Sequence, residues 1–190
     1  MDSDTLQEIF VGAFHSGDTD TLRHMIEKRL DDISVTRPLW QTIAKIGDPG
    51  LFESMVALHR TTKEGRTREL SLLTLATRLS VDASIWGQLE LLVYLIQTHK
   101  VDMDQQQVEY LVSSATFNGN SDIVQYLMDN YKVSKKTQAS LMKHAINYKH
   151  FDLVRLYHQH YSIPIDKKLI KTTGNCTVES FKKPNKKKMT

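Results

Sequence analysis

The sequence predicts an all-helical (all-α) fold, in which about five helix pairs stack side by side into a solenoid. Glycine and proline are scarce, at 8 and 4 of the 190 residues, as expected of a mainly helical chain. Small residues recur at a roughly constant spacing, which is typical of stacked repeats. An apolar residue four positions before each of them shares its helix face. The small residues are Ala13, Ala44, Ala76, Ala115 and Ala145, at spacings of 31, 32, 39 and 30.

The first two repeats (5–35 and 36–66) each read as an inner helix, a short turn and an outer helix. Ile9 and Trp40 precede their alanines by four positions and are expected to face into the stack. The second turn contains Pro49, which suits the start of a helix because its missing N–H needs no partner there. The outer helices carry apolar residues at helical spacing, namely Leu22, Met25 and Ile26, and then Phe52, Met55, Val56 and Leu58.

The third repeat (67–105) has the longest spacing. Leu72 and Ala76 are assigned to its inner helix. Ten residues separate Ala76 from Gly87, where three separate alanine from glycine in the first and fourth repeats. The sequence therefore predicts an insertion of about seven residues near 80–86, between the two helices. Trp86 beside it has two interpretations: a side chain folded back over the stack, or an exposed contact residue.

The last two repeats (106–135 and 136–165) show the pattern most clearly. Leu111 and Leu141 are expected to face the core, and Lys149-His150 replaces the turn glycine in the fifth repeat. The outer helices present Ile123, Val124 and Leu127, and then Leu153, Val154, Leu156 and Tyr157. A branched apolar residue follows the turn position by fourteen residues at Val101, Val133 and Ile163, and is expected to pin the chain as it crosses to the next pair.

The lysine-rich tail (166–190) is predicted to be disordered, because it has little apolar surface to offset the cost of ordering. Eight lysines and one glutamate give residues 167–190 a net charge of +7, which leaves 1–166 with −4 of the total +3. The tail has three interpretations: a nuclear-import signal, a contact with nucleic acid or anionic lipid, or a solubilising end. Its densest basic cluster contains Lys182, Lys183, Lys186, Lys187 and Lys188.

Three segments carry a resemblance to a known family. Residues 71–76 (SLLTLA) are similar to the Thr-Pro-Leu-His-x-Ala start of the ankyrin repeat. Residues 118–127 and 149–156 resemble its turn and second helix. The resemblance covers about residues 6–165 and indicates a degenerate ankyrin-repeat protein.

The sequence also departs from the family pattern. No repeat has the Thr-Pro pair, and the loop after the second helix is about one residue short. The family's glycine in that loop is replaced by His99, Tyr131 and Tyr161. Reduced or absent β-hairpin fingers are therefore expected.

The resemblance implies a non-catalytic protein–protein interaction module that binds a protein partner through the inner helices and the loops before them. The candidate contact residues on or beside those helices are Phe14, Trp40, Gln41, Thr74, Trp86, Ser113, Ser114 and Lys143. The alternative hypothesis is a nucleic-acid-associated or nuclear-targeted helical protein that acts through its basic tail. Deleting residues 172–190 would distinguish the two.

No residue pattern indicates an enzyme, a cofactor or a metal centre. The set His144, His158 and His160 could hold a metal, but no carboxylate or cysteine lies nearby at ligand spacing, so solvated surface histidines are the simpler interpretation. Cys176 lies in the tail and lacks the rigid setting and adjacent base that a nucleophile needs. Scattered single glycines do not form a phosphate-binding loop.

The same composition suggests a compartment. The single cysteine excludes an internal disulfide framework, and residues 1–8 carry three acids and no base, unlike a secretory signal. No apolar run approaches the ~18 residues of a membrane span. We expect an intracellular, cytoplasmic protein without membrane association, imported into the nucleus if the tail directs it. The pattern stops at Ile163, which predicts either a monomer or part of a longer array with its end face covered by further repeats or a partner.

Overall fold

The computed structural model describes residues 3–28, 37–61 and 72–165, which form helices joined by turns and contain no strand. The chain divides into two compact units, Met1–Asp102 and Met103–Thr190. The all-helical prediction is confirmed for the described residues. None of their helices combines the length and apolarity needed to cross a lipid bilayer.

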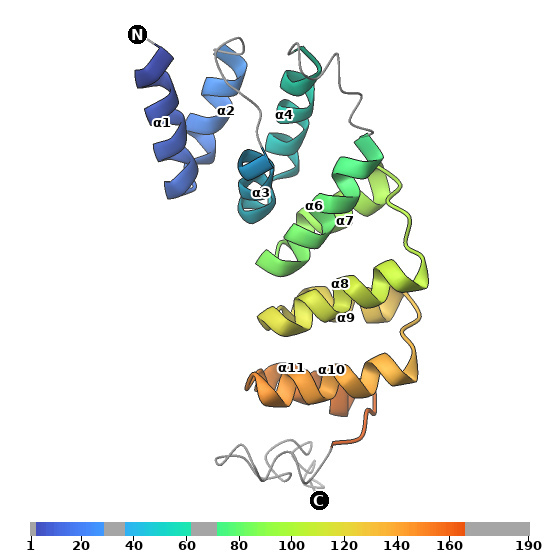
Figure 1. Ribbon diagram of the computed structural model, residues 1–190. Helices are drawn as coiled ribbons and strands as arrows, with labels where there is room; N and C mark the ends of the chain where they lie inside the picture. The colour runs from blue at the N-terminus through green and yellow to red at the C-terminus, as the bar shows by residue number, and fades with distance from the viewer. Residues whose placement is uncertain (1–2, 29–36, 62–71, 166–190) are drawn as a thin grey trace, which may run out of the picture. The chain divides into compact units, whose positions relative to one another are not determined.

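Unit 1 contains three pairs of neighbouring helices (Figure 1). Within the unit, α3 also packs against α6, and α4 packs against both α2 and α7. The first helices α3 and α6 therefore lie side by side, and so do the second helices α2, α4 and α7 in sequence. The helices are α1 (Ser3–Ser16), α2 (Thr19–Lys28), α3 (Arg37–Ile46), α4 (Pro49–Thr61), α6 (Leu72–Trp86) and α7 (Leu89–Thr98).

Unit 2 contains two further pairs. Here α8 packs against α9 and α10 against α11, and the two first helices, α8 and α10, lie side by side. The second pair ends in a π-helical turn, η1, which continues directly from α11. The bounds are α8 (Gln105–Asn118), α9 (Ser121–Asn130), α10 (Lys135–Asn147), α11 (Phe151–Arg155) and η1 (Leu156–His160). The connections 99–104 and 131–134 contain no strand, so a β-hairpin finger is missing at both.

A left-handed residue ends the first helix of every pair. Only glycine adopts this conformation without a steric penalty. Four glycines do so, with φ of +72° to +81°, and Lys149 takes the same place in the fifth pair with φ 61°. The next backbone N–H then closes the helix end, as when Asn120 donates to the carbonyl of Ala115 (2.9 Å). The glycines are Gly17, Gly47, Gly87 and Gly119.

This turn corrects part of the alanine alignment. The residue four positions before the turn is Ala13, Ala115 or Ala145 in three pairs, but Ile43 in the second and Ala83 in the third. The carbonyl of Ala83 accepts from the N–H of Gln88 (2.9 Å). Ala13, Ala115 and Ala145 accept the same bond from the residue after the turn in their own pairs. Ala44 is therefore displaced by one residue and Ala76 by seven, although both side chains are fully buried.

The expected insertion between the helices of the third repeat is also wrong. Residues 80–86 continue α6 without interruption, and the turn follows at Gly87. The run 80–86 keeps helical spacing, because Leu79 and Ala83 are buried one turn apart. The extra residues of this repeat therefore precede α6 and fall in 62–71, outside the described residues.

Most residues expected in the core are buried. Leu111, Leu141 and the second-helix residues Ile123, Val124 and Leu127 are 0% exposed, and the three pinning residues are at most 6% exposed. Ile9 is an exception at 41% exposed, and the neighbouring Phe10 is buried instead. Leu72 and Leu156 are only half-buried.

Candidate functional site

Unit 2 presents a continuous surface along its two first helices. Tyr110, Ser113 and Phe117 follow one another at helical spacing along α8, on the side away from the buried Leu111 and Ala115. The matching positions of α10, counted from the turn that ends each helix, are Ser140, Lys143 and Asn147, all exposed. One turn earlier the pair is Gln106 and Lys136. We call this surface the α8–α10 face.

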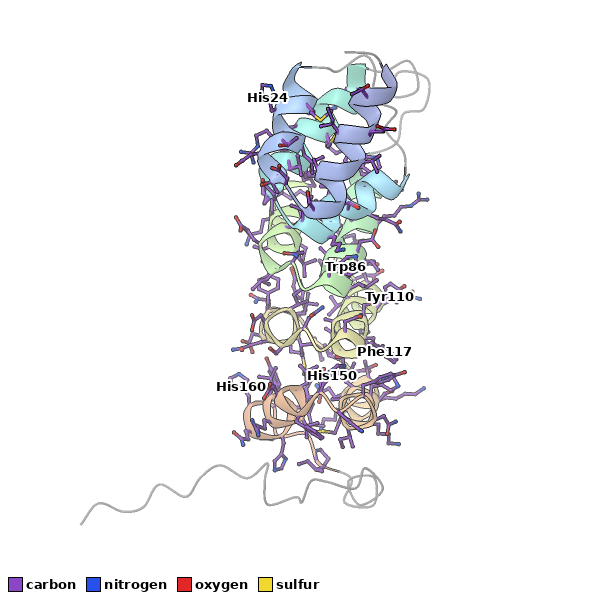
Figure 2. The ribbon with its side chains drawn as sticks, turned by 90° about the vertical axis from the view of Figure 1, so that its left-hand side faces the viewer. His24, Trp86, Tyr110, Phe117, His150 and His160 are labelled. Atoms are coloured by element: carbon purple, nitrogen blue, oxygen red, sulfur yellow. The ribbon has the colours of Figure 1, made fainter. Side chains whose placement is uncertain are left out.

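Aromatic rings dominate the α8 part of this face. Tyr110 is 56% exposed and Phe117 39%, and Tyr148, which follows α10, is 56% exposed. In Figure 2, Tyr110 and Phe117 lie on the opposite side of unit 2 from His160, which belongs to η1. Exposed aromatic residues gathered on one side of a helical framework are unusual for a surface that only meets solvent.

One carboxylate joins the beginnings of the two helices. Glu109 on α8 accepts hydrogen bonds from the Thr137 hydroxyl (2.7 Å), from the Ser134 N–H (3.0 Å) and from the side chain of Gln105 (3.1 Å). These bonds, led by that of Thr137, lower the pKa of Glu109 to about 2. Ser134 itself caps α10 by accepting the N–H of Thr137. The network therefore sets the register between α8 and α10.

Stacked rings join the other ends of the helices. The Phe117 ring lies 4.4 Å from that of His144 and 5.3 Å from that of Tyr148. Tyr148 in turn stacks on His150 at 6.3 Å. The Nε2–H of His150 donates to the carbonyl of Phe117 (2.9 Å). The aromatic part of the face is therefore held from both helices rather than left to move freely.

The two sides of unit 2 differ in charge. Four exposed lysines belong to α10 and the turn after it, and the only acid on α8 or α10 is Glu109 with its three donors. The acids Asp122, Asp129 and Asp152 belong to α9 and α11. Asp129 accepts from the hydroxyl of Tyr161 (2.7 Å), whose pKa is raised first by burial and then by that carboxylate. The lysines are Lys135, Lys136, Lys143 and Lys149.

An open cavity of about 400 Å³ lies on the α9–η1 side of the same unit. Gln125, Arg155 and His160 are among the residues that line it. Its charges are largely paired, because Arg155 contacts Asp152 (3.2 Å) and His160 contacts Asp129 (3.5 Å). The cavity carries weaker evidence of a binding role than the α8–α10 face, since its ionic groups already satisfy one another.

The predicted contact residues of unit 1 fall into different environments. Trp40 is a core residue, because it is only 7% exposed and its ring lies 6.1 Å from that of the fully buried Phe52. The expectation that Trp40 faces into the stack is confirmed, and its choice as a contact candidate is wrong. Gln41 and Thr74 are exposed as expected, and Trp86 is the only exposed aromatic residue in the described part of unit 1. The side chain of Phe14 lies outside the described residues.

Trp86 is exposed, as the second of its two interpretations requires, while its contact with a partner stays a prediction. Its side chain is 50% exposed, and the Nζ of Lys45 lies 5.0 Å from the centre of its ring. Gln88 reaches back to the carbonyl of Lys45 (2.6 Å), which holds the two turns together. Trp86 is thus an exposed aromatic residue of unit 1 that lies beside a lysine.

The remaining predicted contact residues, Ser113, Ser114 and Lys143, belong to unit 2 and differ in exposure. Lys143 is exposed, whereas Ser113 and Ser114 are half-buried. The Ser113 hydroxyl donates its proton to the carbonyl of Glu109 (2.7 Å), so it has no second proton to donate to a partner. Sequence reasoning missed Tyr110, Phe117 and Tyr148. The seven-residue spacing of Tyr110 and Phe117, opposite Leu111 and Ala115, is the signal that would have identified this face.

The three histidines considered as metal ligands have separate environments. His144 lies against Phe117, and its Nδ1 is buried with no hydrogen-bond partner among the described residues. His158 contacts the carbonyl of Ile163 (3.2 Å), and His160 contacts Asp129. The described residues contain no group of three or more potential ligands that could hold a metal ion. The basic-tail lysines, Lys182, Lys183, Lys186, Lys187 and Lys188, lie outside the described residues.

No protein-family model, curated protein or solved structure matches this chain. The fold and the α8–α10 face therefore define it as an all-helical protein with an exposed aromatic and basic surface.

Proposed function

We propose that the chain is a non-catalytic protein-binding module, built as a degenerate ankyrin-like solenoid, that holds a protein partner on the α8–α10 face. The observation that carries this proposal is the exposure of Tyr110, Phe117 and Tyr148 on a surface whose backbone is braced at both ends. Aromatic residues supply most of the binding energy at many protein interfaces. A braced surface loses little conformational freedom when it binds, so more of the contact energy appears as affinity.

The ankyrin-like part of the proposal rests on local geometry. Five helix pairs each end their first helix in a left-handed residue, and in four of them the following N–H bonds to an alanine carbonyl five residues back. The first helices α3 and α6 pack against each other in unit 1, and α8 and α10 do so in unit 2. That pattern leaves one side of the first helices free for a partner, which is the side occupied by Tyr110 and Phe117.

The direct test is affinity capture with the full chain from an extract of the cells that make it. We expect a set of proteins retained by the wild type and lost from a Tyr110→Ala/Phe117→Ala variant. Truncating two central aromatic contacts should weaken binding by about tenfold or more. A matched control, Tyr126→Ala on α9, removes an aromatic ring from outside the face and should retain the same proteins. Equal retention by all three chains would contradict the proposal.

A chain that ends at residue 171 separates this function from the alternative based on the tail. If the tail is only a solubilising end, its deletion leaves capture unchanged. Loss of all captured material on deletion, with nucleic acid binding by the full chain at low salt, would favour the nucleic-acid hypothesis.

A further inference from the structure

The α8–α10 face combines two kinds of side chain in a fixed register. On α10, Lys136 and Lys143 are seven residues apart and point to the same side of the helix. Both are exposed, and the neighbouring α8 presents Gln106, Tyr110 and Phe117 at or next to the matching positions. An aromatic row and a basic row therefore run side by side along the same surface.

No ion pair in the described part of unit 2 neutralises the positive charge of the basic row. Neither ion pair of the described part of unit 2 includes a lysine, since one joins Arg155 to Asp152 and the other His160 to Asp129. Glu109 is already occupied by three donors. Asp104 caps α8 by accepting the N–H of Gln107 (2.7 Å). An external group with negative charge is what this surface lacks.

We propose that the α8–α10 face binds an acidic segment of another protein, whose carboxylates contact Lys136 and Lys143 while an apolar side chain packs on Tyr110 and Phe117. The inference rests on the proposed function and adds the chemistry of the partner. Charge complementarity selects among partners and speeds their association, and the aromatic row supplies the apolar contact.

The ring packing favours a peptide over a single-stranded nucleic acid. Bases bind such surfaces by stacking on open aromatic faces. One face of Phe117 is already covered by His144, with ring centres 4.4 Å apart, and Tyr148 stacks on His150. What remains exposed on these rings suits an aliphatic or aromatic side chain that packs from one side.

The test selects binders from a random peptide library displayed on phage, with the full chain as bait. We expect the selected peptides to be enriched in Asp and Glu around an apolar residue. Two selected peptides are then synthesised with a fluorescent label, and their binding is measured by fluorescence anisotropy. Affinity should fall severalfold between about 50 and 300 mM salt, because exposed charges are screened.

Two variants separate charge from fold. Lys136→Gln/Lys143→Gln should weaken the peptides severalfold, and Lys136→Glu/Lys143→Glu about tenfold or more, since the second reverses both charges. The matched control, Lys132→Glu/Arg155→Glu, changes the net charge equally but outside the face, and should bind like the wild type. All four positions changed here are surface residues, so thermal melts followed by circular dichroism should coincide.

The outcomes distinguish this proposal from the proposed function. Peptides that depend on Tyr110 and Phe117, but carry no excess of acid and tolerate the Lys→Glu changes, would overturn the acidic partner and leave the binding module standing. Peptides that depend on neither the aromatic nor the basic row would overturn both. A labelled 20-nucleotide oligothymidine that binds more tightly than any selected peptide, and loses binding in the Lys→Glu variant, would also overturn the inference.

Discussion

Glu109 shows how a single residue can set the geometry of a surface. Its carboxylate receives one hydrogen bond from its own helix and two from the start of α10. Removing any carboxylate that accepts several hydrogen bonds leaves those donors without their best partner. The residue lies beside the α8–α10 face and stabilises it without being the proposed point of contact.

We predict that Glu109→Gln destabilises the chain by about 1 kcal/mol near pH 7, because a neutral amide accepts weaker hydrogen bonds. The folded-state pKa of Glu109 is about 2, below the usual value of 4.5. Its ionised form therefore stabilises the fold above pH 4.5, and this contribution is lost as the pH falls towards 2. Urea unfolding at pH 7, 4 and 2.5 should show that the difference in free energy of unfolding between wild type and variant becomes smaller as the pH is lowered. A constant difference would contradict this role.

The two tryptophans illustrate the limit of reading burial from a single residue type. The sequence placed both Trp40 and Trp86 among contact candidates, but Trp40 packs on Phe52 while Trp86 is half-exposed beside Lys45. Trp40 belongs to a run of buried positions one residue removed from the alanine register. The four-residue spacing of Trp40 from the buried Ala44 already predicts a core position, so its choice as a contact candidate conflicts with the sequence pattern.

Trp40→Ala should therefore destabilise the fold by roughly 3–5 kcal/mol, as expected for a large buried aromatic residue. Trp86→Ala should cost less than about 1 kcal/mol, mainly the contact with the Lys45 ammonium. Thermal or urea unfolding of the two variants gives the comparison. Similar losses for both would mean that Trp86 is also a core residue.

At the scale of an element, the turn is a better marker of each helix pair than the alanine. Gly17, Gly47, Gly87, Gly119 and Lys149 share the left-handed conformation, whereas the alanines share a place in only three pairs. The physical reason is that only glycine adopts this conformation without a steric penalty, whereas isoleucine can replace alanine where the neighbouring helix leaves room. Aligning on the turn would also have placed the extra residues of the third repeat before α6.

Lys149→Gly should stabilise the chain by about 0.5–1 kcal/mol, because it relieves a left-handed residue that bears a side chain. Gly119→Ala is the reciprocal change. It places a Cβ 2.8 Å from Nδ1 of His150 and strains a φ of +80°, so a loss of about 1–2 kcal/mol is expected. Chemical unfolding of both variants tests the pair. Opposite signs for the two changes are required.

At the scale of the whole molecule, the sequence predicted the helices and most of the core. The apolar periodicity is clear in helices that have one side in the core and the other in solvent. It correctly predicts the burial of Leu111, Leu127 and Leu141, which are all 0% exposed. The pattern fails at Ile9, which is 41% exposed while the neighbouring Phe10 is buried. The α8–α10 face is predicted only in part. Lys143 is among the predicted contacts, whereas Tyr110, Phe117 and Tyr148 are not, although the spacing of Tyr110 and Phe117 opposite Leu111 and Ala115 already indicates an outward side of the helix.

The central claim is that the α8–α10 face is where this chain holds a protein partner. The most direct measurement is a ¹H–¹⁵N NMR titration of the full chain with a peptide selected by phage display. The account predicts chemical-shift changes concentrated in the exposed residues of α8 and α10, especially Tyr110, Phe117 and Lys143, and in the turn at Tyr148–His150. Changes centred on α9 and η1, or confined to residues 172–190, would contradict it.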